Sequence, residues 1–315
     1  MPKNLTLFKG STGLNNKQDP VRLKYNSRTG ISELAAASNI VIEDSRRISR
    51  RKGYTRRLEG DFHSLFSDGG DCLFVKEESG QGALCFLFPD YTYKAVRALT
   101  PNARMKYEQI DDVIYYMNGY ERGKVRKGDY QSYGWNKGDY VGPETKRVFS
   151  DPPIGTDLRY YNGQMYIVQG RVIWVSEGFS VSFYDLANSY LEFEDRVNLI
   201  RPVADGLFIG TEKKIIFLEG SDSSNMSERT VADFPAVSGT DCTFTGILGF
   251  QKGGSVTISS EGGTQYAIWL SQKGVCVGGP EGEFVNLTKD RLVLPNALTG
   301  AGLIYNNEYV ATMNP

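Results

Sequence analysis

The chain has 315 residues, of which 40% are hydrophobic, so it is long enough to bury the core of one large domain or of two ordinary ones. Its 36 basic and 37 acidic residues give a formal net charge of −1, which argues against a dedicated nucleic-acid-binding domain of the basic type. The opening residues lack the apolar run of a secretory signal, and no stretch has the length of a membrane span.

Residues 1–44 hold neither the period of a strand nor that of a helix for long. This pattern predicts an extended N-terminal arm that lies on a partner instead of folding on itself. Within it, Ser32–Asn39 is compatible with a short helix capped by Ser32 or with a simple turn. The apolar residues of the arm stand among Lys, Asn, Gly and Asp, and they include Leu5, Leu7, Phe8 and Leu14.

From Val41 onward the chain reads as strands, and one phrase recurs about every 40 to 50 residues, the period of propeller blades. A turn of Gly, Asp or Asn leads into a short apolar strand, then a second turn and another strand. A unit of this length must stack on its neighbours to bury its apolar face, so residues 45–315 are predicted to form an all-β β-propeller. The first strands of the copies cover Cys72–Val75, Val113–Tyr116, Met165–Val168, Leu207–Gly210, Ser255–Ile258 and Tyr309–Ala311.

The last copy has about two of the four strands that a blade needs. We expect Arg46–Arg56 to supply the missing strands, so that the N- and C-terminal strands close the last blade together and remove an open sheet edge. The count is then about six blades, with seven as the alternative because the spacing is irregular.

Candidates for chemistry are few. His63 is the single histidine, so a histidine-rich metal site or a Ser-His-Asp triad has no basis, and we predict no catalytic residue, cofactor or metal. A glycosidase remains an alternative, since carboxylates occur at Asp111, Asp112, Asp195, Asp205 and Glu261, although all occupy turns that favour acidic residues. The separated Cys72, Cys85, Cys242 and Cys276 predict buried thiols, with a Cys72–Cys85 bridge as the alternative.

Basic residues crowd into twelve positions after the arm. They have three interpretations: contacts to phosphates, an edge strand that deters unwanted pairing, or a docking face for an acidic neighbour. Together with the arm they supply the predicted interface residues Leu5, Leu7, Phe8, Leu14, Arg46, Arg47, Arg50 and Arg51.

An ordered series of short motifs opens the chain. It consists of Leu7–Gly10, Gly13–Asn16, Asp19–Leu23, Glu33–Asp44 and Ile48–Tyr54, and a later phrase joins Asp205–Thr211 to Ile216–Gly220. This series resembles the opening and the blades of the tail nozzle (tail tubular, portal-associated) β-propeller proteins of short-tailed bacteriophages. The chain is shorter than many of those proteins, so the resemblance does not extend to their fibre-binding domains.

The resemblance implies a structural virion protein of the phage tail, made in the cytoplasm of the host bacterium. Identical subunits, six in the expected homo-oligomer, would form a ring below the portal and head–tail adaptor. The ring would extend the DNA exit channel, retain the genome until infection and pass double-stranded DNA without reading its sequence. A receptor- or carbohydrate-binding, lectin-like propeller is the alternative, with Trp135, Tyr160, Tyr161 and Trp174 as stacking faces for sugars.

Overall fold

The computed structural model describes residues 9–43, 45–67, 69–139, 146–250, 256–305 and 308–314, with the backbone alone at 247–250 and 256–262. The described residues form strands joined by turns and three short 3-10 helices, at Pro20–Arg22, Ser223–Asn225 and Pro280–Gly282. None of these helices has the length or apolar character needed to cross a membrane.

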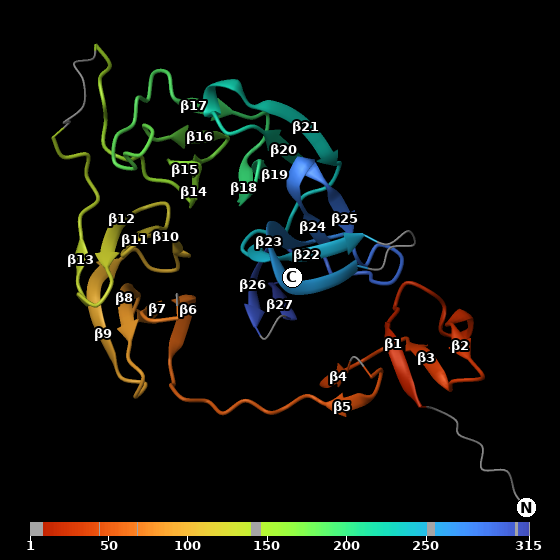
Figure 1. Cartoon of the computed structure of the whole chain (residues 1–315). Helices are drawn as coiled ribbons and strands as arrows, with labels where there is room; N and C mark the ends of the chain where they lie inside the picture. Colours follow the sequence, from red (N-terminus) through yellow and green to blue (C-terminus); the bar gives the residue numbers. More distant parts are fainter. Residues whose placement is uncertain are drawn as a thin grey trace, which may run out of the picture.

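Five four-stranded antiparallel sheets follow one another around a ring, and each is a meander in which successive strands are neighbours (Figure 1). The predicted β-propeller is therefore confirmed. The first blade consists of β6 (Asp61–Ser67), β7 (Cys72–Glu78), β8 (Gln81–Leu87) and β9 (Tyr93–Leu99), and the second of β10 (Lys106–Ile110), β11 (Val113–Met117), β12 (Arg122–Arg126) and β13 (Ser132–Tyr133). The third consists of β14 (Asp157–Tyr161), β15 (Gln164–Gln169), β16 (Val172–Val175) and β17 (Tyr190–Glu192), and the fourth of β18 (Val197–Val203), β19 (Gly206–Thr211), β20 (Ile215–Glu219) and β21 (Ser227–Ala232). The fifth consists of β22 (Cys242–Phe250), β23 (Val256–Ser271), β24 (Gly274–Gly278) and β25 (Phe284–Asn286).

A sixth sheet has two strands, β26 (Thr299–Tyr305) and β27 (Glu308–Asn314). Its half-buried Tyr309, Ala311 and Met313 pack on the fifth blade beside Val237 and Leu270. The predicted count of about six blades agrees with five complete sheets and this sixth one, but the sixth has only two strands among the described residues.

The recurring Gly, Asn and Asp phrases are the hairpin turns of the blades. Asn162 and Gly163 have φ values of 44° and 83° between β14 and β15, the left-handed conformation that a two-residue hairpin loop requires. Asp111 takes the same conformation between β10 and β11, with φ of 53°. Asn and Asp tolerate this region of backbone space better than other side chains, which explains their recurrence.

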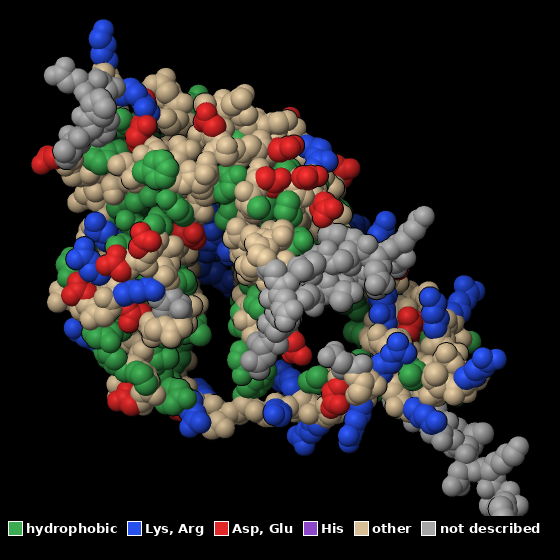
Figure 2. All heavy atoms as spheres, in the orientation of Figure 1, with side chains coloured by type: hydrophobic (Ala, Val, Ile, Leu, Met, Phe, Trp, Pro, Cys, Tyr) green, Lys and Arg blue, Asp and Glu red, His purple; other side chains and the backbone are tan. Residues whose placement is uncertain are grey.

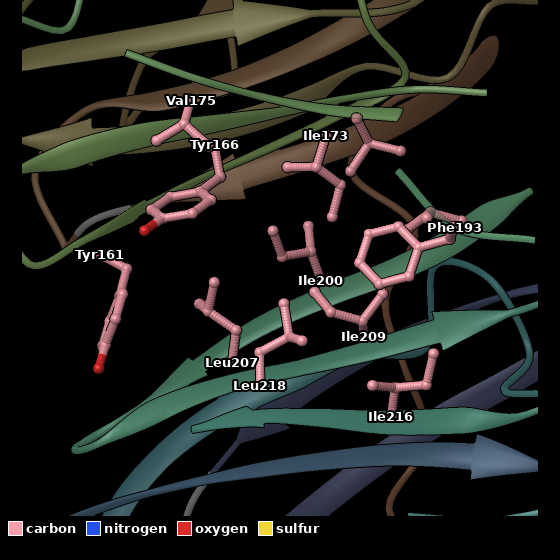
Figure 3. Packing of buried hydrophobic residues seen from close by; sticks show 12 residues of the cluster. Tyr161, Tyr166, Ile173, Val175, Phe193, Ile200, Leu207, Ile209, Ile216 and Leu218 are labelled. Atoms are coloured by element: carbon pink, nitrogen blue, oxygen red, sulfur yellow. The ribbon is translucent and has the colours of Figure 1, made fainter. Parts of the chain in front are cut away.

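The core lies between neighbouring blades. Figure 3 shows residues of the third blade facing those of the fourth, where the alternation of each strand directs apolar side chains into one shared layer. Burial of each such side chain contributes roughly 1.5–3 kcal/mol to folding. The layer contains Tyr161, Tyr166, Val168, Ile173, Val175, Phe193, Val197, Ile200, Leu207, Ile209, Ile216 and Leu218.

The predicted arm folds into two small sheets that the sequence pattern did not indicate, and the second of them extends past residue 44 to Arg50. A three-stranded sheet joins β1 (Gly10–Leu14), β3 (Ile31–Leu34) and β2 (Tyr25–Asn26) in that order. The helix considered over Ser32–Asn39 is wrong, because the start of that segment belongs to β3. A turn in which the Gly30 amide donates to the Asn26 carbonyl sets up this strand pairing.

The structure corrects the predicted closure of the last blade by Arg46–Arg56. Within this segment β5 (Ile48–Arg50) pairs with β4 (Ile40–Ile42) and not with β26 or β27. The turn between β4 and β5 is short, and the Arg46 amide donates to the Glu43 carbonyl within it. A local hairpin costs less loop-closure entropy than pairing with strands 250 positions away, which explains the preference.

Candidate functional site

The basic residues after the arm lie on an exposed strap. We define the basic strap as Arg46, Arg47, Arg50, Arg51, Lys52, Arg56 and Arg57, all of which are exposed. Residues 51–59 carry no strand or helix, and they lead from β5 to β6 beneath the ring (Figure 1). Figure 2 shows Lys and Arg side chains along this strap.

Aromatic rings contact two of the strap guanidinium groups. Arg51 lies 4.8 Å from the ring centroid of Tyr54, and Arg57 lies 5.2 Å from that of Tyr91. In the described part of the chain, Arg56 is the strap residue with a carboxylate within 4 Å, that of Glu59 at 3.5 Å. Among the described residues, no carboxylate lies within 4 Å of the other strap charges, and all of them are exposed.

Charge is divided unequally between the arm and the propeller. Residues 1–60 contain 13 Lys and Arg against 5 Asp and Glu, whereas residues 61–315 contain 23 against 32. The first segment has a formal charge of +8 and the second of −9. The net charge of the whole chain does not show this division. Counting basic and acidic residues separately in each segment of the sequence would have revealed it.

The arm is docked on the loop that follows the fifth blade. The Asn16 amide donates to the Arg291 carbonyl at 3.0 Å, and the Asn16 side chain exchanges hydrogen bonds with the backbone of Val293. The Arg291 guanidinium donates to the Thr12 carbonyl at 2.8 Å and lies 3.6 Å from the carboxylate of Glu33. These contacts fix where the basic strap starts.

The structure describes five of the eight predicted interface residues and places four of them together. Arg46, Arg47 and Arg50 lie on or beside the hairpin of β4 and β5, and Arg51 follows it. Leu14 is half-buried at the end of β1, where it pairs with Leu34 of β3. Leu5, Leu7 and Phe8 lie outside the described residues.

Six charged side chains meet where the inner strands of the second, third and fourth blades converge. We call them the axial cluster: Lys106 and Glu108 from β10, Asp157 and Arg159 from β14, Arg201 from β18, and Asp241 just before β22. Asp241 is the centre, since its Oδ2 accepts from Arg201 Nε at 2.6 Å and from Arg159 Nη2 at 3.3 Å. The Arg159 side chain is 3% exposed and lies 3.1 Å from Asp157.

Burial and opposite charges act against each other in this cluster. Burial alone would raise the pKa of Asp241, but Lys106, Arg201 and Arg159 together hold that pKa well below its usual range. Burial raises the pKa of Glu108, and the nearby Arg159 opposes that rise only in part. Three cations face three carboxylates, so the cluster is formally neutral and holds four blades together.

A hollow of about 590 Å³ opens between the third, fourth and fifth blades. Tyr160 and Tyr161 line it together with the carboxylates of Asp205 and Glu219. The hydroxyl of Tyr161 donates to the Gly220 carbonyl at 2.9 Å. The hollow thus unites two of the four aromatic residues proposed for sugar stacking, whereas Trp135 is buried in a core cluster with 1% exposure.

The remaining candidates for chemistry are dispersed over the fold. His63 Nε2 lies 3.0 Å from the Glu77 carboxylate on the neighbouring strand, and its Nδ1 lies 2.8 Å from Ser64 Oγ. Asp111 and Asp205 occupy turns of different blades, and Asp195 is paired with Lys213 at 2.6 Å. Among the described residues no group of three or more His, Cys, Asp or Glu is placed to hold a metal.

No disulfide joins the four cysteines, all of which the structure describes, and the predicted burial holds for Cys85, Cys242 and Cys276, whereas Cys72 is half-buried. Burial raises the pKa of Cys85 and of Cys242 to about 11 and that of Cys276 to about 12. Thiolate, the nucleophilic form, is therefore disfavoured at these three positions at neutral pH.

Comparison with known proteins finds likenesses to solved structures only. No protein-family model and no curated protein matches the chain. Similar solved structures include KlHsv2 with a replaced loop 6CD (10% identity, TM-score 0.44, covering 84% of this chain and 79% of that one) and the AfRom2 CNH domain (12%, 0.36, 79% and 73%). A protein from Lactobacillus plantarum also matches (11%, 0.41, 78% and 75%). At these identities and TM-scores, nothing about this chain is concluded from the likenesses.

Proposed function

We propose that this protein is a structural subunit of a phage tail nozzle. Identical copies form a ring that extends the DNA exit channel below the portal and its adaptor. The ring helps to retain the genome and then to release it. The motif series at the start of the chain motivates this assignment, and the β-propeller supplies a scaffold for a ring subunit.

The observation that carries the proposal is the separation of charge between the arm and the propeller. A ring needs a heterologous interface, in which one patch of a subunit meets a different patch of the next. The exposed basic strap is one such patch. Acidic side chains gather over β20 and β21 (Figure 2), where Glu219 and Glu228 are exposed, and they offer a complementary patch. Complementary potentials of this kind set register and speed of association.

The proposal is tested by imaging the purified chain alone and with a portal–adaptor complex. We expect closed rings of uniform size, either free or seated on the adaptor. The matched variant carries Arg50→Glu and Arg51→Glu, which reverses two strap charges without touching a buried residue. The proposal would be contradicted if the wild-type chain stayed monomeric at low ionic strength, both alone and with the portal–adaptor complex, and did not bind the adaptor. If the strap binds duplex DNA and not another subunit, its basic residues serve as contacts to phosphates.

A lectin-like propeller is the second candidate, favoured by the hollow beside Tyr160. Its volume lies in the range of ligand pockets, and an aromatic ring with carboxylates nearby is suited to hydroxyl-rich ligands. A glycan array in which the wild type binds and Tyr160→Ala does not would support it. An array without a binder removes this candidate.

A further inference from the structure

The outer edge of β27 lacks a strand partner within the described residues. β27 pairs through its whole length with β26, and on its other side no backbone hydrogen bond reaches residues 308–314. The first edge of β26 is engaged, because the Gly300 amide donates to the Ser238 carbonyl at 2.8 Å. The sixth sheet therefore presents a row of amide and carbonyl groups along one strand.

The same sheet exposes an apolar face. Leu303 and Val310 lie opposite each other in the register and are 51% and 41% exposed, and Tyr305 on the same face is 63% exposed. The opposite face packs on the fifth blade through Tyr309 and Ala311. A blade normally buries both faces against its neighbours, so this one has lost half of its packing.

The first blade has a matching apolar surface. Leu65 is 69% exposed, and a hollow of about 240 Å³ beside it is lined by Leu58, Phe62, Phe74 and Leu87. Figure 2 shows the molecule hollowed between this blade and β26–β27, with the strap passing below the hollow. Arg104, from the loop after the first blade, donates to the Gly300 carbonyl and joins the two sides at one point. We call this region the open sector.

Natural edge strands usually carry lysine, proline or a bulge that prevents pairing with another chain. β27 has none of these, since Glu308 is its one charged residue and its register with β26 is unbroken. The strap does not protect the edge either, because its strand β5 pairs with β4 and residues 51–59 form no strand. An edge with apolar neighbours and without such protection is suited to strand addition.

We propose that the segment Lys3–Lys9 of a second copy adds to β27 as a strand and fills the open sector. This inference rests on the proposed ring, since it names where the arm of one subunit lies on the next. The segment has seven residues, as β27 does, and Leu5 and Leu7 alternate with Asn4 and Thr6 as in a half-buried strand. Its terminal lysines are opposite in sign to the acidic propeller.

Cross-linking between two differently tagged copies tests this placement. One copy carries Thr6→Cys and the other Ala311→Cys, the central positions of the two strands, which come together whichever way the added strand runs. Both copies carry Cys72→Ala, and the buried thiols of Cys85, Cys242 and Cys276 stay unreactive. With a short bismaleimide we expect a mixed dimer in at least tenfold excess over the control pair Thr6→Cys and Glu212→Cys.

A second pair of variants addresses the edge itself. Val310→Lys places a charge on the exposed face and is expected to lower the cross-linking yield at least tenfold, whereas Val310→Thr retains it. Circular dichroism confirms that both variants fold.

The outcomes separate this inference from the proposed ring. Rings in native mass spectra without the Thr6–Ala311 cross-link would overturn the strand placement and leave the ring intact. In a third sample, one chain carries both Thr6→Cys and Ala311→Cys, and a cross-link within that chain without any between copies would overturn the placement as well. A cross-linked dimer without any ring would support strand addition and contradict the nozzle assembly.

Discussion

Asp241 and Arg201 form the shortest ion pair of the axial cluster, with 2.6 Å between Oδ2 and Nε, and the Asp241 side chain has no exposed surface. The Arg201 guanidinium also donates to the Asp241 backbone carbonyl at 2.8 Å. The pair connects the inner strand of the fourth blade to the residue that begins the fifth. The Asp241 carboxylate thus contacts cations from the inner strands of the second, third and fourth blades.

We predict that Asp241→Asn destabilises the propeller strongly, because it leaves Arg159 and Arg201 without their shared anion. Removing one partner of a buried ion pair costs about 3–5 kcal/mol. Urea unfolding followed by tryptophan fluorescence measures the change. The control is Asp222→Asn at an exposed turn, which should change the free energy of unfolding by less than about 1 kcal/mol. Equal losses in the two variants would show that the cluster is not a main support.

The axial cluster also predicts a dependence on pH. The folded pKa of Asp241 is well below its unfolded value, so its contribution to stability is present above about pH 4 and is lost as the pH falls through the folded pKa. Glu108 has a raised pKa and acts in the opposite direction, losing stability as the pH rises. Unfolding free energies measured from pH 7 to pH 3 should fall more steeply in the wild type than in Asp241→Asn. Parallel curves would contradict this assignment.

The layer between the third and fourth blades predicts a cavity effect. Ile209 is completely buried there, and Ile209→Ala should lower the free energy of unfolding by about 2–5 kcal/mol. Val293→Ala, at a position that is 57% exposed, serves as the matched truncation and should have little effect. Thermal unfolding of both variants measures the change. Equal stability of Ile209→Ala and Val293→Ala would show that the layer between the third and fourth blades is not tightly packed.

Arg291 is predicted to hold the arm on the propeller. Arg291→Ala removes the hydrogen bond to Thr12 and the ion pair with Glu33, and it should accelerate proteolysis in residues 9–60 several-fold while the propeller stays intact. Arg171→Ala, which removes an exposed ion pair with Glu192, is the control. Unchanged cleavage of the arm would show that the Asn16 contacts suffice.

The sequence predicted the propeller well because its signals are local. The turn at Asn162–Gly163 and the apolar strands around it depend on residues that are neighbours in the chain. The axial cluster was missed, since Arg159 and Asp241 are 82 positions apart and neither stands in a recognisable motif. The pairing of β5 was also missed, because a strand of three residues does not show which of two partners it will choose.

The interface prediction divides in the same way. Arg50 and Arg51 could be recognised as exposed from their charge alone. The docking of Asn16 on Val293 required the folded chain, since the sequence carries no sign that these two segments meet. The open edge of β27 likewise becomes visible only once the strap is seen to pair elsewhere.

The central claim is that oppositely charged patches of one chain join copies into a ring. Native mass spectrometry of the wild type should give a single closed oligomer at low ionic strength. Arg50→Glu with Arg51→Glu should give monomers, and the added changes Glu219→Arg and Glu228→Arg should restore the oligomer, because the attraction is then reversed in sign on both sides. A wild type that stays monomeric, or an oligomer unaffected by the strap charges, would contradict the account.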